Sequence, residues 1–229
     1  MIRIIVLSII CIASVTNIRA QNVTSIGEVW LGYISSIRLN DKFSIWNDFH
    51  YVKTSFFASR HGLTYDITPR LNITGGYAWV TTATSFTEDL VRPEHRPWGQ
   101  IVGVTPLSQK IDFRYRFRYD ARFRKKVTSS EVLDERMFYS RIRFMSSLRF
   151  QLGDISPEAG LHFNVMDELL LNAGRQIDNG IDQNRLYLLF GVTKKSITVL
   201  SGYDWRVIPH GNQDYTFRHG LTVWVVHSI

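Results

Sequence analysis

The stretch Lys110–Arg124, KIDFRYRFRYDARFR, decides the fold class because apolar and charged side chains alternate along all of it. A period of two residues is typical of a β-strand with one apolar and one polar face. The apolar face carries Ile111, Phe113, Tyr115, Phe117, Tyr119 and Phe123, and the polar face carries Asp112, Arg114, Arg116, Arg118, Asp120 and Arg122. The pattern predicts one long strand with a row of arginines on a single side.

The segment Arg141–Leu152 repeats this alternation and again has arginines on its polar face. Nine further strands are predicted at residues 27–38, 42–52, 56–67, 71–83, 97–107, 158–171, 183–194, 196–207 and 217–228. Most of these segments exceed the ~5 to 6 residues of an ordinary globular strand. They match the ~9 to 11 residues that a tilted strand needs to cross a bilayer. After residue 21 no stretch has the apolar period and caps of a helix.

The connections between the predicted strands are of two kinds. Tight connections lie at residues 39–41, 68–70, 108–109 and 194–195, and long polar ones at residues 84–96, 125–134, 172–182 and 208–216. Short turns on one side and long loops on the other are typical of outer-membrane barrels, which in single bacterial chains have an even number of strands. Because eleven strands are counted, we predict an antiparallel transmembrane β-barrel of 10–12 strands. Its apolar face points outward and its lumen is charged and rich in arginine.

Aromatic residues bear on which face of the strands is buried, a question that alternation alone leaves open. The chain has 14 Phe, 10 Tyr and 6 Trp, and Tyr or Trp often stands near the end of a predicted strand. Such placement suits the aromatic girdles of a membrane barrel. Aromatic side chains also fill ordinary β cores, so a soluble periplasmic β protein with its apolar face inside stays open as an alternative.

Residues 1–20 have the features of a cleaved secretory signal. Met1-Ile2-Arg3 gives a positive start, Ile4–Val15 is apolar and Ala20 is a small residue at the expected cut. The apolar run is too short for a spanning helix, which needs ~20 residues. The chain then divides into a signal peptide at 1–20 and a single barrel domain at 21–229.

Removal of the signal changes both the cysteine content and the charge. Cys11 is the only cysteine, so the mature chain can form neither a disulfide nor a thiolate metal site. Loss of Arg3 and Arg19 takes the formal charge from +7 to +5. A basic balance can favour nucleic acid or anionic lipid, but secretion argues against nucleic acid as a partner.

Five short motifs resemble an uncharacterised family of bacterial outer-membrane proteins, domain of unknown function 2490. The motifs are Pro93–Gln100 (PEHRPWGQ), Phe113–Arg118 (FRYRFR), Glu135-Arg136 followed by Arg141–Phe144 (RIRF), Asp167–Asn172 (DELLLN) and Asp182–Tyr187 (DQNRLY). Their order and spacing are similar to those of the family across most of the mature chain. The resemblance implies a barrel in the outer membrane of a Gram-negative-type bacterium, with no established activity.

The charged residues on the predicted lumen face form the main candidate site. They are Glu94, Arg96, Asp112, Arg114, Arg116, Arg118, Asp120, Glu135, Arg141, Arg143, Glu168, Asp182 and Arg185. Buried charges must be paired or hydrated. A structural interpretation is a ladder of ion pairs that fills a narrow barrel, with Glu168 or Glu135 as the partner of Arg143. A functional interpretation is a selectivity filter for anions or a docking site for a small acidic solute.

Catalytic chemistry has one weak candidate in the sequence, the pair Glu94 and His95. A carboxylate beside an imidazole could tune a general base, and the predicted loop position suits a site. The same two residues could equally form a cap or a salt bridge. The seven histidines are scattered, none lies in a nucleophile motif, and no metal spacing is present. We therefore predict no catalytic residue, no metal and no cofactor.

Three functions are carried forward from the sequence. The favoured one is a non-enzymatic envelope component or narrow conduit of the outer membrane, with a largely occluded lumen. The first alternative is an outer-membrane lipid-modifying hydrolase, which requires Ser, His and an acid or amide close together on the outer wall. The second is a soluble periplasmic ligand-binding β protein. The expected partners are outer-membrane lipid, lipopolysaccharide and the barrel-assembly machinery.

Overall fold

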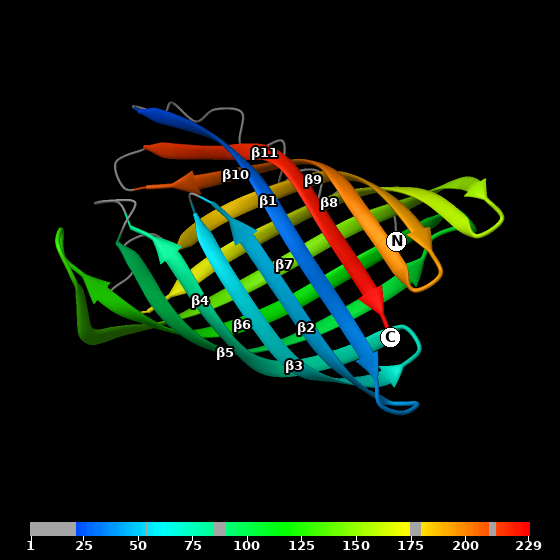
Figure 1. Cartoon of the computed structure of the whole chain (residues 1–229), viewed down its shortest axis with the longest axis horizontal. Coiled ribbons are helices and arrows are strands. Elements are labelled where there is room, and N and C mark those ends of the chain that lie inside the picture. The colour runs from blue at the N-terminus through cyan, green and yellow to red at the C-terminus, as the bar shows by residue number, and fades with distance from the viewer. Residues whose placement is uncertain (1–21, 54, 85–89, 175–179, 211–213) are drawn as a thin grey trace.

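A computed structural model describes residues 22–53, 55–84, 90–174, 180–210 and 214–229 (Figure 1). Eleven strands form one closed barrel in which each strand pairs with its neighbours in sequence and the last returns to the first. The strands are β1 (Val23–Arg38), β2 (Phe43–Val52), β3 (Phe56–Thr68), β4 (Leu71–Ala83), β5 (Val91–Pro106), β6 (Ile111–Val127), β7 (Val132–Ser156), β8 (Ala159–Ala173), β9 (Ile181–Lys194), β10 (Ile197–Pro209) and β11 (Tyr215–Ser228). The predicted all-β barrel of 10–12 strands is confirmed. The predicted signal peptide lies outside the described residues.

The seam that closes the barrel differs from the prediction of a purely antiparallel sheet. Strands β1 and β11 pair in parallel, from Val23↔Tyr215 to Ser36↔Ser228, whereas every other pair is antiparallel. In an up-and-down barrel with an odd number of strands, the first and the last strand necessarily run in the same direction. Barrels of single bacterial chains typically have an even number of strands, whereas this barrel has eleven.

Two predicted long loops contain strand residues. Residues 84–96 were predicted as a long polar loop, but β5 already begins at Val91. The pairing of β5 with β6 passes from His95↔Phe123 to Trp98↔Asp120, so the register skips Pro97. The predicted loop 125–134 shrinks to Thr128–Glu131, where Thr128 N–H donates to the Glu131 carbonyl (2.9 Å).

The two ends of the barrel differ in their connections. The turn end carries the connections at residues 39–42, 69–70, 107–110, 157–158 and 195–196, together with the C-terminal residue Ile229. Asn40 Oδ1 closes the first of these turns by accepting from Lys42 N and Phe43 N (both 3.0 Å). The loop end carries the start of β1 and the remaining connections. The two ends of the described chain thus lie at opposite ends of the barrel.

The polarity of the wall is the reverse of that of a soluble barrel. Large apolar side chains point outward and are exposed on many strands, among them Leu31, Phe49, Tyr77, Phe117, Phe144, Phe190, Tyr203 and Leu221. The largest fully buried side chains are three arginines, Arg118, Arg122 and Arg206. Alternation along each strand thus sends charge inward, as predicted. In the described part of the chain, no helix is long and apolar enough to cross a membrane.

Candidate functional site: an arginine-lined lumen

Glu94 is the centre of one charge cluster inside the barrel. Its carboxylate is fully buried and accepts from Arg96 Nε (2.8 Å), from Arg122 Nε and Nη2 (2.5 and 2.6 Å) and from Arg124 Nε (3.2 Å). The register Glu94↔Arg124 between β5 and β6 brings these side chains together. One carboxylate therefore neutralises only one of three neighbouring positive charges.

Asp120 and Glu168 are the centres of two further clusters. Asp120 accepts from Arg118 Nε (2.9 Å) and from Arg143 Nε (2.7 Å). Glu168 accepts from Arg116 Nη2 (2.6 Å) and Arg185 Nη1 (3.3 Å), and Arg143 Nη1 lies 3.8 Å away. Arg143 therefore links the two carboxylates. Its nearest acidic partner is Asp120 on β6, and the predicted partner Glu168 is the more distant one.

Smaller pairs complete the network around the lumen. Arg141 Nη2 donates to Asp182 Oδ1 (2.8 Å), and Arg60 Nη2 donates to Asp48 Oδ1 (2.7 Å). His50 Nε2 lies 2.9 Å from the same Asp48 oxygen. Near the seam that closes the barrel, Glu28 of β1 pairs with Arg206 of β10 and with Arg218 Nη1 of β11 (3.0 Å). The sequence-based prediction missed this last set of residues, since it considered mainly β5 to β9.

Three predicted network residues lie apart from these clusters. Glu135 is largely exposed and its carboxylate pairs with Lys126 Nζ (2.6 Å), because β7 extends beyond the rim of the barrel. Arg114 and Asp112 face the interior, but among the described residues neither forms an ion pair within 4 Å. The other ten predicted residues join the clusters centred on Glu94, Asp120, Glu168 and Asp182. Glu135 is thus not part of the lumen network.

The proposed acid–base pair of Glu94 and His95 is separated by the barrel wall. The two residues are adjacent in β5, so their side chains point to opposite faces. Glu94 lies inside among arginines, whereas His95 Nδ1 contacts the Tyr77 hydroxyl on the outside. The prediction that the pair lies in a loop is also wrong, since both residues belong to β5. They cannot act together on one substrate.

Positive charge exceeds negative charge inside the barrel. In the described strands the inward arginines are Arg60, Arg92, Arg96, Arg114, Arg116, Arg118, Arg122, Arg124, Arg141, Arg143, Arg149, Arg185, Arg206 and Arg218. The inward carboxylates are Glu28, Asp48, Glu94, Asp112, Asp120, Glu168, Asp182 and Asp204. Among the described residues, one buried guanidinium nitrogen of Arg118 and one of Arg122 have no hydrogen-bond partner. The lumen is therefore a cationic interior with donors left for an anion.

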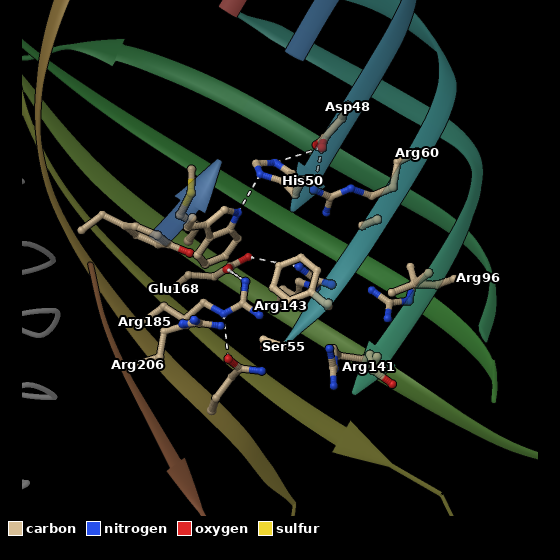
Figure 2. A pocket seen from close by; sticks show the side chains of 18 of the residues that line it. Asp48, His50, Ser55, Arg60, Arg96, Arg141, Arg143, Glu168, Arg185 and Arg206 are labelled. Carbon is tan, nitrogen blue, oxygen red and sulfur yellow. Dashed lines mark hydrogen bonds and ion pairs between the residues drawn. The ribbon is translucent and has the colours of Figure 1, made fainter. Parts of the chain in front are cut away.

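A cavity of about 550 Å³ lies within this network. Ten of the arginines line it, but only two carboxylates do, Asp48 and Glu168 (Figure 2). Aromatic rings from several strands meet beside it: Trp30 packs edge-on against Phe56, Tyr187 and Trp224, with ring centroids 5.3 to 5.8 Å apart. Arg206 lies over Trp30, 4.9 Å from the ring. Guanidinium groups and aromatic rings together line this cavity.

The fold and this site define a closed β-barrel with an apolar exterior and an arginine-rich interior. The chain belongs to the family described as Protein of unknown function (DUF2490), whose model matches residues 27–216. This confirms the resemblance found in the sequence. No curated protein matches the chain. Within the described residues, no group of three or more His, Cys, Asp or Glu side chains could hold a metal ion.

Proposed function

We propose that the chain spans the outer membrane of a Gram-negative-type bacterium as a barrel whose lumen is occluded and cationic. The observation that carries this proposal is the reversed polarity of the wall, with Phe117 and Phe144 exposed outside and Arg118 and Arg122 buried inside. In water, so large an exposed apolar surface would drive association. In a bilayer it is the favourable arrangement, because each arginine on the lipid face would cost ~2 to 4 kcal/mol at the midplane.

The outward aromatic residues support a membrane location. Tyr51, Trp79 and Trp205 are exposed on the outer wall toward the loop end. At the turn end, the rings of Phe43 and Tyr65 pack 5.1 Å apart. Two aromatic belts of this kind mark the two interfaces of a membrane barrel. With short turns on the periplasmic side, the loop end faces the cell exterior.

The first prediction concerns extraction from the membrane. Since the outer wall is apolar on many strands, we expect the protein to stay in the outer-membrane fraction through washes with high salt and alkaline carbonate. Detergent should release it, and the unheated protein should migrate differently from the boiled protein on a gel. Release by salt or carbonate alone would favour the soluble periplasmic alternative and rule out the proposal.

The second prediction concerns occlusion. Barrels of ~8 strands fill with side chains, whereas those of ~16 leave an aqueous channel, and this barrel of eleven strands also has an aromatic cluster inside. In planar bilayers we expect little steady conductance, with any residual current carried by anions because arginines outnumber carboxylates. Trp30→Ala should increase the current, because Trp30 packs against rings of other strands inside the barrel.

The matched control for occlusion is Trp205→Ala, which removes the same ring from the outer wall. It should leave the current unchanged. A large, steady current that prefers cations in the wild-type protein would contradict both the occlusion and the role of the arginines.

A further inference from the structure

A serine, a histidine and an asparagine form a hydrogen-bonded chain on the outer wall of the barrel. Ser59 Oγ lies 2.9 Å from His61 Nε2, and His61 Nδ1 lies 2.8 Å from Asn47 Oδ1. Ser59 and His61 are two residues apart on β3 and so share its outward face. The register Asn47↔His61 places the amide beside the imidazole on β2. The arrangement is independent of the arginine-lined lumen, which lies on the other side of the wall.

The asparagine is held in the orientation that this chain requires. Asn47 Nδ2 donates to Ser35 Oγ (3.3 Å) on β1, which directs Oδ1 toward His61. An amide oxygen can only accept a hydrogen bond, so His61 Nδ1 carries the proton and Nε2 is free to accept from the Ser59 hydroxyl. A nucleophile beside a base that a third group orients is the arrangement of a catalytic triad.

We infer that Ser59, His61 and Asn47 form the active site of an esterase that cleaves acyl esters of membrane lipids. Ser59 Oγ forms a bond to the ester carbonyl carbon while His61 Nε2 takes the hydroxyl proton. The tetrahedral intermediate collapses, the ester C–O bond breaks and the leaving oxygen takes the proton from His61. Water, activated by His61, then attacks the acyl-serine, which releases a carboxylic acid and restores Ser59. Asn47 keeps the imidazole oriented throughout.

The surroundings of the triad suit a lipid substrate. Phe49 and Trp79 are the cross-strand neighbours of Ser59, and Tyr77 is that of His61; all three are exposed on the outer wall. The Phe49 ring packs 5.4 Å from the His61 ring. Ser59 lies three residues from Phe56, the first residue of β3, at the loop end. In a membrane this level meets the boundary between head groups and acyl chains, where the ester carbonyls of lipids lie.

The choice of lipid as substrate rests on the proposed membrane location, whereas the triad chemistry does not.

A second Ser–His contact on the outer wall provides an internal comparison. Ser25 Oγ lies 3.1 Å from His219 Nε2, but His219 Nδ1 contacts the Tyr203 hydroxyl (2.9 Å) instead of an acid or amide oxygen. A phenol hydroxyl can donate as well as accept, so it does not fix the imidazole tautomer. The structure assigns catalysis to Ser59 and not to Ser25.

The test uses the full-length barrel in neutral detergent with two substrates, p-nitrophenyl butyrate and a diacyl phospholipid in mixed micelles. Both should be hydrolysed, with release of fatty acid from the phospholipid. Ser59→Ala should reduce the rate to background, and His61→Ala should reduce it by about 10² to 10⁴-fold. Asn47→Ala should give a smaller loss, because it removes only the orienting group. Ser25→Ala is the matched control and should keep the full rate.

A covalent probe adds a readout that a structural role would not give. A fluorophosphonate should label the wild-type chain once, and the label should be absent in Ser59→Ala although the unheated variant still migrates as the folded form. Absence of both labelling and hydrolysis, or full activity in Ser59→Ala, would overturn the esterase assignment. Hydrolysis of the butyrate ester without the phospholipid would overturn the lipid substrate. The extraction experiment tests membrane location separately, so failure of either proposal is recognised on its own.

Discussion

Replacing Glu94 by leucine is expected to lower the free energy of unfolding by about 3–5 kcal/mol, the range for breaking a buried ion pair by removing one partner. The carboxylate is fully buried and accepts hydrogen bonds from Arg96, Arg122 and Arg124. Without it, three guanidinium groups would face one another with no counter-charge. Urea titration of the detergent-folded protein, followed by the shift between folded and unfolded bands, measures the change.

The control is the double variant Glu94→Leu with Arg122→Leu. Arg122 makes two of the hydrogen bonds to Glu94, at 2.5 and 2.6 Å. Its removal therefore takes away the positive charge that lay closest to the Glu94 carboxylate. The double variant should be more stable than Glu94→Leu alone, since a lone buried charge is worse than none. Losses that simply add in the double variant would show that these charges are hydrated and not coupled.

The strands of this barrel could be predicted from the sequence because their periodicity is a local property. Lys110–Arg124 alternates throughout, and β6 covers almost the same residues. The parallel seam could not be read in this way, because pairing of Val23 with Tyr215 joins residues far apart in the sequence. The start of β5 was missed because residues 84–96 were predicted to form one polar connection, whereas Val91 already pairs with Ala83 of β4.

The candidate sites differ in how far the sequence revealed them. Arginines at alternate positions of a strand share one face, which predicts a charged lumen. Carboxylates on the same face are then the expected ion-pair partners of these arginines. The particular partner depends on register, so Arg143 was assigned Glu168 or Glu135, although Asp120 is closest at 2.7 Å. The outer-wall triad was missed for the same reason. Ser59 and His61 share a face by parity, but only the register of β2 and β3 brings Asn47 beside them.

Replacing Phe144 by arginine is expected to cost about 2–4 kcal/mol of folding stability if the outer wall faces lipid. Phe144 points outward from the middle of β7 and pairs with Phe117 on β6, so its ring would lie near the centre of the bilayer. A charge there has no partner and little access to water. Refolding into liposomes over a urea series, followed by the shift between folded and unfolded bands, gives the free-energy change.

The same substitution at Phe138 is the matched control, since Phe138 also points outward from β7 but lies six residues nearer to the loop end. Its cost should fall to about 0–1 kcal/mol, because a long arginine side chain near the interface can reach the head groups. Both variants lose a phenylalanine ring, so the difference between their costs measures the effect of depth in the bilayer alone. Equal costs at both positions would mean that water surrounds β7 along its whole length, and the proposed location in the membrane would then be wrong.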